Sequence, residues 1–398
     1  MSTAIDHCSF CDKPKDRVGK LIVSHKVAIC NECVDLCSNL LKDNKKTVKS
    51  EPSTVVIPDP RDVKEYLDQY VVGQNSAKIM LSVAIANHYK RISGPERIDK
   101  SNILMIGPTG TGKTLLAKTL ARYLDVPFVI ADATCLTEAG YVGDDVESMI
   151  ARLYTAAEGD IERCQRGIVF LDEVDKIARK SESSTTTKDV SGEGVQQALL
   201  KLIEGVKCRV PVNGARKNNN AETVEIDTRN ILFIAGGAFV GMERIIQNRV
   251  QGTAIGFGAK LATPAISNQE SVIPDDLVKF GMIPEFVGRF SSYVTLQDLD
   301  RTQLISILTE IKGNMLGQYR WLFDQDSINL QFDTESLDII VDRTLSTRTG
   351  ARGLHTELER ILLPHMFDLP RYRKQDILQV TINKTLVNTP MTLLKENQ

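Results

Sequence analysis

The sequence predicts an α/β protein whose largest domain is a parallel β-sheet with helices on both faces. Short apolar runs of the length of buried strands alternate with segments whose apolar residues have helical spacing. A glycine-rich loop pattern follows the first of these runs, and four cysteines near the N-terminus have the spacing of a metal site. We therefore expect a small metal-stabilised module, the α/β domain and a small, mainly helical C-terminal domain.

Length and composition limit what the chain can be. Its 398 residues suffice for two or three domains, and 42% hydrophobic with 25% charged residues is typical of a soluble globular protein. The 49 basic and 51 acidic residues give a net charge of −2, which favours neither nucleic acid nor a membrane as the main partner. No apolar run approaches a membrane span, and the N-terminus resembles neither a secretion signal nor a transit peptide. We expect a cytoplasmic protein.

The N-terminal module contains two C-x-x-C pairs, Cys8 with Cys11 and Cys30 with Cys33. Each pair makes a tight turn that directs two thiolates at one metal, and four such ligands form the closed tetrahedral site of a structural Zn²⁺. About 40 residues bury too little apolar surface to fold alone, so the metal is expected to supply most of the stability. The alternatives are disulfides and a redox pair.

Two other residues of this region, His7 and Cys37, are spare candidate ligands, although Cys37 fits better on a following helix. Residues 46–60 are polar and rich in proline, which is typical of a flexible linker; an ordered surface loop is the alternative for their second half. We expect a zinc-binding domain over 1–45, the linker, a large α/β domain over 61–298 and a small domain over 299–398.

The α/β domain begins with a strand, a loop and a helix that together predict a nucleotide site. The run 103–106 is typical of a buried strand, and 115–124 has helical spacing. Between them stands a phosphate-binding loop made of Gly107, Pro108, Thr109, Gly110, Thr111, Gly112, Lys113 and Thr114. Backbone N–H groups and the helix N-terminus attract phosphate, Lys113 reaches the β- and γ-phosphates of ATP, and Thr114 holds Mg²⁺. The alternative is a chance glycine-rich turn.

A further buried strand, 167–171, ends in the carboxylates of Asp172 and Glu173. The carboxyl ends of parallel strands meet at one edge of the sheet, so these carboxylates are expected beside the phosphate loop. Asp172 is expected to support Mg²⁺, and Glu173 to polarise the water that attacks the γ-phosphate. A solvated strand end is the alternative, but the upstream loop favours hydrolysis of ATP.

The remaining periodic segments complete both domains. Further strands are expected at 126–131 and 231–235. We expect helices at 63–70, 76–91, 193–206, 302–319, 334–345 and 351–367, a hairpin at 207–230 and a strand pair within 377–382.

Two loops have more than one interpretation. Tyr141 and Val142 lie between glycines, so Tyr141 is either at an exposed loop tip or packed inside its own domain. Ile255, Gly256 and Phe257 lie in a segment with little periodicity, which suits either a docking loop or no function.

Two arginines, Arg289 and Arg352, each stand beside a glycine at an element boundary. An arginine in such a place either contacts a phosphate, where it contributes strongly to the rate of hydrolysis, or forms an ordinary surface salt bridge.

Taken in order, these motifs resemble the ClpX family of bacterial AAA+ protein unfoldases over nearly the whole chain. The resemblance rests on the four cysteines, the phosphate loop and segments 70–74, 140–143, 171–173, 255–257, 288–289 and 350–352. It implies the AAA+ fold and a homohexameric ring with ATP between neighbouring subunits. In such a ring Val71, Val72 and Gly73 line the adenine pocket. Arg289 reaches a neighbour's ATP, and Arg352 senses the nucleotide of its own subunit.

The resemblance also implies roles for the loops. Tyr141 and Val142 correspond to the pore loop that grips the substrate polypeptide. The loop of Ile255, Gly256 and Phe257 corresponds to the one that docks on the ClpP peptidase. The zinc module corresponds to a dimerising domain that recruits adaptors and some substrates.

Three further segments complete the comparison with the family pattern. Residues 179–189 correspond to a second pore loop. The pore-entrance loop of the family usually reads Arg-Lys-His, whereas this chain has Arg-Lys-Asn at 216–218. The strand that ends at Ala235 is followed by Gly236 and Gly237, so no polar sensor residue is assigned there.

The sequence thus predicts an ATP-driven protein unfoldase that recognises tagged or unfolded substrates and feeds them to ClpP. One alternative is a chaperone that remodels protein complexes without a peptidase. Another is a nucleic-acid remodeller, against which the near-neutral charge and the single tryptophan weigh.

Overall fold

The computed structural model of the chain describes residues 6–24, 27–46, 57–94, 98–137, 144–179, 192–212, 223–252 and 272–389. The chain divides into two compact units, Met1–Val56 and Ile57–Gln398, which are described separately. Several predicted features lie outside the described residues, namely Tyr141, Val142, Ile255, Gly256, Phe257 and the segments 180–189 and 216–218.

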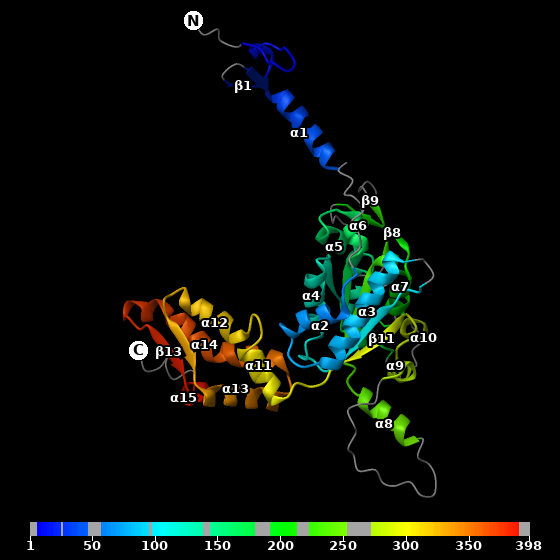
Figure 1. Cartoon of the computed structure of the whole chain (residues 1–398), viewed down its shortest axis with the longest axis vertical. Helices are drawn as coiled ribbons and strands as arrows, with labels where there is room; N and C mark the ends of the chain where they lie inside the picture. Colours follow the sequence, from blue (N-terminus) through cyan, green and yellow to red (C-terminus); the bar gives the residue numbers. More distant parts are fainter. Residues whose placement is uncertain are drawn as a thin grey trace. The chain divides into compact units, whose positions relative to one another are not determined.

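The first unit is a small hairpin and helix built around the cysteines (Figure 1). Strand β1 (Leu21–Ser24) pairs antiparallel with β2 (Val27–Cys30), and helix α1 (Asn31–Lys46) follows directly. A short 3₁₀ helix, η1 (Lys15–Arg17), precedes the hairpin. Cys37 lies on α1, as predicted. The buried centre consists mainly of cysteine side chains, so the described residues of this unit form almost no apolar core of their own.

The second unit contains a five-stranded sheet in the order β11-β3-β10-β7-β4, with every neighbouring pair parallel. The strands are β3 (Asn102–Ile106), β4 (Phe128–Asp132), β7 (Ile168–Asp172), β10 (Leu232–Gly237) and β11 (Phe290–Thr295). All residues of β3 and β10 are buried, because helices cover both faces of the sheet. The predicted parallel sheet is confirmed.

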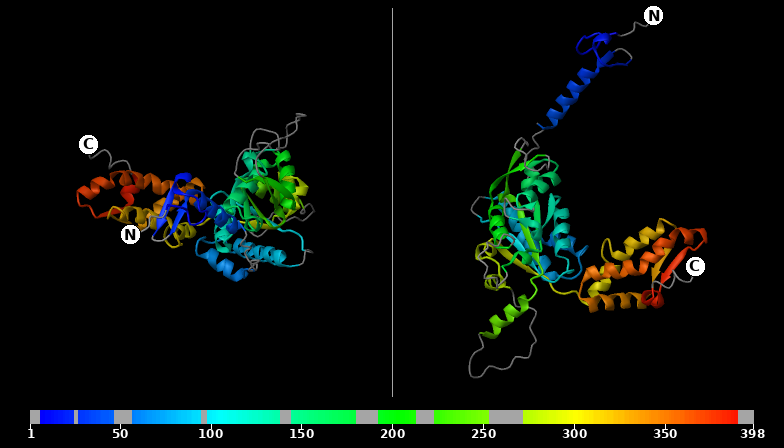
Figure 2. Two further views of the ribbon diagram at one scale, coloured as in Figure 1. Left: turned by 90° about the horizontal axis from the view of Figure 1, so that it is seen from above. Right: turned by 180° about the vertical axis from the view of Figure 1, so that it is seen from behind.

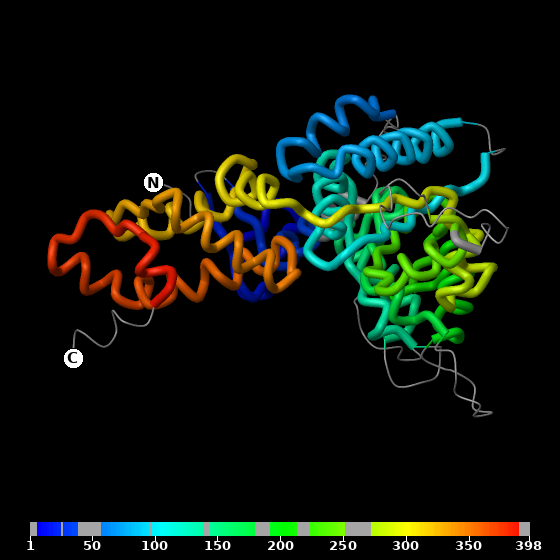
Figure 3. Tube along the Cα trace, turned by 90° about the horizontal axis from the view of Figure 1, so that it is seen from below, coloured from blue at the N-terminus to red at the C-terminus, as the bar shows by residue number. Residues whose placement is uncertain are grey.

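Helices and short strands surround this sheet, and α2 and α3 lie side by side with α3 against β11 (Figure 3). The predicted hairpin is confirmed, since β8 pairs antiparallel with β9. The other elements of this part are α2 (Pro60–Asp68), α3 (Asn75–Ser93), α4 (Lys113–Leu124), η2 (Ala133–Cys135), β5 (Leu136–Thr137), β6 (Asp144–Asp145), α5 (Ser148–Ala156), α6 (Ile161–Gln165), η3 (Val174–Ile177), α7 (Glu193–Glu204), β8 (Lys207–Pro211), β9 (Thr223–Asp227), η4 (Thr228–Asn230), α8 (Met242–Gly252), α9 (Pro274–Phe280) and α10 (Pro284–Val287).

The C-terminal part is mainly helical (Figure 2). It has its own apolar core. Its elements are α11 (Arg301–Thr309), α12 (Met315–Asp324), β12 (Asn329–Phe332), α13 (Thr334–Thr347), α14 (Ala351–Lys374), β13 (Gln379–Ile382) and α15 (Lys384–Asn388). The predicted strand pair within 377–382 is wrong. Only β13 forms there, and it pairs parallel with β12, about fifty residues earlier in the chain.

The predicted single helix 302–319 is also wrong, because the chain breaks between α11 and α12. Gly313 has a φ of +73°, which a continuing helix does not allow. Asn314 then starts the second helix, since its Oδ1 accepts a hydrogen bond from the N–H of Gly317 at 2.7 Å. The apolar spacing continues across this break, so periodicity alone predicts one helix.

His88 on α3 is fully buried and makes the stability of this unit dependent on pH. Burial, together with the nearby cations of Arg91 and Lys100, lowers the pKa of His88 to about 3. Between about pH 6.5 and about pH 3, the imidazole of His88 is protonated in the unfolded chain but stays neutral in the folded chain. The free energy of unfolding therefore decreases in this window, by up to about 1.4 kcal/mol per pH unit from this residue.

We expect His88→Phe to reduce this acid sensitivity in denaturant unfolding of the second unit between pH 7 and pH 4.5. The exposed His355 offers a matched control, and His355→Gln should retain the pH dependence of the wild type. Equal slopes of the unfolding free energy against pH for His88→Phe and the wild type would contradict the assignment.

Candidate functional site

The four predicted zinc ligands lie together in the first unit. The sulfur atoms of Cys8, Cys11, Cys30 and Cys33 are all within 4.8 Å of one another. The Sγ–Sγ distance is 3.9 Å for Cys8 and Cys33 and 3.7 Å for Cys11 and Cys30. A tetrahedral zinc with ~2.3 Å bonds separates its sulfurs by about 3.8 Å, whereas a disulfide requires about 2.05 Å. The donor set therefore fits structural zinc and not disulfides.

Backbone N–H groups donate to two of these sulfurs, and they favour the thiolate form of Cys8. The N–H of Cys30 donates to Cys8 Sγ at 3.3 Å, and the N–H of Cys33 donates to Cys30 Sγ at 3.4 Å. Burial alone raises the pKa of Cys8, but N–H hydrogen bonds from Phe10, Cys11 and Cys30 outweigh it and lower the pKa to about 6. Such bonds favour the thiolate, which is the form that binds zinc. Neither His7 nor Cys37 belongs to this cluster.

A pocket of about 490 Å³ lies at the carboxyl ends of β3, β7 and β10 in the second unit. It brings together three predicted groups: the phosphate loop, the acidic pair at the end of β7, and Arg352 at the start of α14. Because β10 lies between β3 and β7, the loop and the acidic pair face each other across the end of β10.

The phosphate loop and the acidic strand are joined by a hydrogen bond from Thr114 Oγ1 to Asp172 Oδ2 at 3.1 Å. This pair of oxygen donors is of the kind that Mg²⁺ uses in phosphate-loop enzymes, so the residues present fit the ion. The Lys113 ammonium donates to the carbonyl oxygens of Gly107 and Pro108 at 2.6 and 2.9 Å, which holds it over the loop. Burial lowers the pKa of Lys113, and Asp172 partly offsets this effect.

Gly110 brings the C-terminal part of the unit into contact with the phosphate loop. Its φ is +81°, and a Cβ at this position would overlap the carbonyl oxygen of Thr349. The backbone N–H of Ala351 donates to the carbonyl oxygen of Gly110 at 3.1 Å. This contact sets the first turn of α14, and with it Arg352, at the edge of the pocket.

Glu173 is exposed and has a left-handed backbone with a φ of +55°, which is uncommon for a residue other than glycine. Its own N–H donates to Asp172 Oδ1 at 3.0 Å, so both oxygens of Asp172 are engaged. Left-handed residues of this kind concentrate at active sites, where the surrounding fold maintains the strain.

Asp175 also lines the pocket, although no motif in the sequence singled it out. Its side chain is only 4% exposed, and its Oδ1 accepts the N–H of Ala238 at 3.2 Å. A Cβ at Gly237 would lie 2.8 Å from this oxygen. Because Asp175 lies this close, position 237 has no room for a side chain. This explains why a glycine occupies the place at the end of β10 where we looked for a polar sensor residue. The sequence did offer one signal for Asp175, since it is an acidic residue three positions after Asp172, the last residue of β7.

The residues that were predicted to line the adenine pocket border a different pocket from the phosphate loop. Val71, Val72 and Gly73 border a space of about 470 Å³ together with Ile311 and Lys312 of the C-terminal part. Val71 nevertheless adjoins the phosphate loop, because its Cγ1 is 3.9 Å from the position that a Cβ of Gly112 would take. The two pockets therefore approach each other at Val71.

Arg289 is not among the described residues that line either pocket. Its guanidinium forms an ion pair with Glu204 at the end of α7, and its carbonyl oxygen accepts the side-chain amide of Asn102 at 3.0 Å. The structure thus places Arg352 at the phosphate loop of its own subunit and Arg289 away from it.

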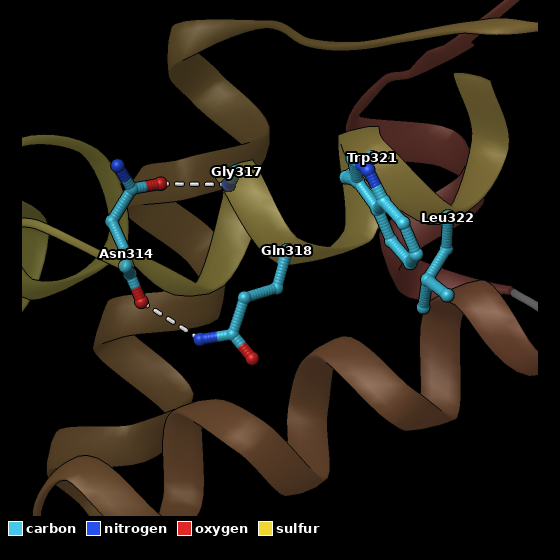
Figure 4. Close-up of a pocket in the computed structure, with 6 residues that line it drawn as sticks. Asn314, Gly317, Gln318, Trp321 and Leu322 are labelled. Carbon is cyan, nitrogen blue, oxygen red and sulfur yellow. Dashed lines mark hydrogen bonds between the residues drawn. The ribbon is translucent and has the colours of Figure 1, made fainter. Parts of the chain in front are cut away.

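A further pocket of about 570 Å³ lies beside α12 (Figure 4). It is bordered by Gly313, Asn314, Gly317, Gln318, Trp321 and Leu322. None of these side chains is charged, and Gln318 already donates to the carbonyl oxygen of Gly313 at 2.7 Å. This pocket carries no group for acid–base or phosphate chemistry.

Three family models match parts of the chain. The "ClpX C4-type zinc finger" matches residues 6–43, the "AAA domain (Cdc48 subfamily)" residues 98–293, and the "C-terminal, D2-small domain, of ClpB protein" residues 299–381. The chain is also 48% identical over 390 residues to the "ATP-dependent Clp protease ATP-binding subunit ClpX" of Treponema denticola, which covers 96% of this chain and 93% of the relative. The chain belongs to the ClpX family.

As a member of the ClpX family, the protein is an AAA+ ATPase with an N-terminal four-cysteine zinc module, and both predictions are confirmed. None of the described helices has the length and apolar character that crossing a membrane requires.

Proposed function

We propose that this protein is an ATP-driven unfoldase that pulls substrate proteins apart and feeds them to the ClpP peptidase. The observation that carries the proposal is the pocket that joins the phosphate loop, the acidic pair and Arg352. In this proposal the residues that hydrolyse ATP contact the C-terminal part of the unit through Arg352. The family to which the chain belongs supports the link between hydrolysis and work on proteins.

In this proposal the pocket binds ATP by its phosphates. The loop from Gly107 to Gly112 presents backbone N–H groups, and Lys113 neutralises the β- and γ-phosphates. Mg²⁺, when bound, spreads the charge of the phosphates; Thr114 and Asp172 would hold it. Glu173 orients and deprotonates the attacking water. Val71, Val72 and Gly73 contact the adenine.

Hydrolysis is transmitted through the contact between the loop and α14. Arg352 bonds the γ-phosphate side of the nucleotide, and the backbone bond from Ala351 to Gly110 keeps α14 beside it. Loss of the phosphate removes the partner of Arg352, so the C-terminal domain can rotate relative to the sheet domain. This rotation is the step that moves the substrate.

The arrangement of Arg289 supports a homohexameric ring. Arg289 lies outside the pocket of its own subunit and pairs with Glu204; in the ring it would exchange this partner for the nucleotide of a neighbouring subunit. In such a ring Tyr141 and Val142 grip the substrate in the central pore. The loop with Ile255, Gly256 and Phe257 docks on ClpP. The zinc module binds adaptors.

The decisive experiment measures degradation of a tagged, folded fluorescent reporter by the full chain with ClpP and ATP. We expect Tyr141→Ala to lower the rate of reporter unfolding at least about tenfold, because the aromatic ring supplies most of the grip. ATP turnover should continue, since the ATP site is intact. If both unfolding and turnover remain unchanged, the gripping role is wrong.

A second variant separates the unfoldase from its rivals. Phe257→Ala should stop degradation and ClpP co-migration while leaving unfolding of the reporter intact. A wild-type chain that unfolds the reporter but never binds ClpP would instead be a chaperone that acts alone. ATPase activity that rises steeply with single-stranded DNA and falls with salt would favour a nucleic-acid remodeller.

A further inference from the structure

The middle of helix α7 contains a fully buried amide, Gln196, with a relative exposure of 0%. Its Nε2 donates to the carbonyl oxygen of Ile177 at 2.7 Å. Its Oε1 accepts the backbone N–H of Ile283 at 2.9 Å. One side chain therefore joins two backbone segments that are more than one hundred residues apart in the sequence.

These two segments belong to the two halves of the ATPase chemistry. Ile177 is the last residue of η3, the short helix that begins directly after Glu173. Ile283 precedes α10, and α10 leads directly into Gly288 and Arg289. Gln196 therefore stands between the segment that carries the proposed general base and the segment that carries the proposed trans-acting arginine.

Other contacts stiffen the same connection. The N–H of Arg179, just after η3, donates to the carbonyl oxygen of Gly281 at 2.8 Å. Glu193 and Glu204, near the two ends of α7, form ion pairs with Arg179 and Arg289 respectively. Thus α7 contacts the first segment at Glu193 and Gln196 and the second at Gln196 and Glu204. Its apolar face is buried in the core.

We propose that Gln196 is a positioning residue that couples the hydrolysis segment of one ATP site to Arg289, which serves the next site. The inference rests on the proposed roles of Glu173 and Arg289. In a ring, each subunit uses Glu173 on its own ATP and offers Arg289 to a neighbour. A movement of η3 on hydrolysis shifts the Ile177 carbonyl, and Gln196 passes that shift to Ile283 and on to Arg289.

The chemistry of the amide supports this role. Gln196 supplies one donor and one acceptor, and both partners are backbone groups, one at the end of η3 and one directly before α10. A buried bond of this kind has a fixed length, so the two segments move together or the bond breaks. An apolar side chain of the same size fills the space but transmits no directional constraint.

The test is a double-mutant cycle on the full chain with Gln196→Met and Arg289→Ala. We expect Gln196→Met to lower kcat for ATP about 10- to 100-fold, because small misplacements of a catalytic group have effects of this size. The Kd for a fluorescent, slowly hydrolysed ATP analogue should stay within about twofold. On the Arg289→Ala background, Gln196→Met should lower kcat by less than about twofold, since both act through one group.

Gln197 offers a matched control, because it is exposed on the same helix and bonds only Glu193 among the interactions of its side chain that the structure describes. Gln197→Met should behave as wild type. If the losses in kcat of the two single variants multiply in the double variant, Gln196 has only a structural role. An unchanged kcat in Gln196→Met also overturns the inference. If Arg289→Ala itself leaves kcat unchanged, the proposed trans-acting role is at fault instead.

Hydrogen exchange tests the coupling directly, first in the wild type and then in a Gln196 variant. Binding of the ATP analogue should change the protection of the amides of residues 281–289 at least about threefold, together with those of residues 174–179. The same change should be lost from 281–289 in Gln196→Met, which keeps neither the donor for Ile177 nor the acceptor for Ile283. No change at 281–289 in the wild type would overturn the inference.

Discussion

Substitution of Glu173 by glutamine is expected to lower the rate of ATP hydrolysis about 10²- to 10⁴-fold while ATP binding persists. Glutamine has nearly the same size as glutamate, so the left-handed turn at this position and the bond from its N–H to Asp172 remain. Only the basic carboxylate is removed. Phosphate release measured at saturating ATP, together with the Kd of a fluorescent ATP analogue, separates the two effects.

The control for this prediction is Glu162→Gln on α6, where an exposed glutamate lies outside the pocket. It should hydrolyse ATP as the wild type does. Hydrolysis by Glu173→Gln within about threefold of the wild type would show that another group activates water. Asp175 would then be the residue to test, because its carboxylate also borders the pocket.

Replacement of Cys30 by serine is expected to unfold the zinc module and to leave the ATPase unit folded. Structural zinc in small modules supplies about 10–16 kcal/mol of binding free energy, which becomes folding free energy. The first unit has little else, since Cys8, Cys30 and Cys33 make up its buried cluster among the described residues. We expect zinc content to fall from one per chain to near zero, with loss of amide protection across β1 and β2.

Cys37→Ser is the matched control, because Cys37 is a cysteine of the same unit outside the four-sulfur cluster. It should retain one zinc per chain and a protected hairpin. The second unit should hydrolyse ATP in both variants, since it is a separate compact unit. Retention of zinc and of amide protection in Cys30→Ser would argue that three cysteines and another ligand suffice.

The parts of the fold that the sequence predicted best are those where local pattern and chemistry agree. The strand before Gly107 and the helix after it follow from the phosphate-loop motif, because the loop works only between such elements. By contrast, β11 lies at the sheet edge and contains Ser291, Ser292 and Thr295, so it lacks the apolar run that marks the inner strands.

The candidate site shows the same division. The loop, Asp172 and Glu173 were predictable because the parallel strands of one sheet end at the same edge, even where another strand lies between them. The partners of Arg289 and Gln196 were not, since each contact joins residues far apart in the chain and no spacing rule links them. Asp175 is intermediate: its position three residues after the strand end was a weak signal, but its contact with Gly237 is visible only in the structure.

The bond between Ala351 and Gly110 uses only backbone atoms, and this has a consequence for how the family can diverge. A contact without side chains does not depend on which residues the C-terminal domain carries elsewhere, provided that Gly110 and Gly350 keep their close approach. We therefore expect this one contact to persist when side chains elsewhere in the C-terminal part change. Residues 299–381 also match the model of the small domain of ClpB, so a chimaeric chain that takes this segment from a ClpB protein would test whether the backbone bond at Gly110 forms with other side chains around it.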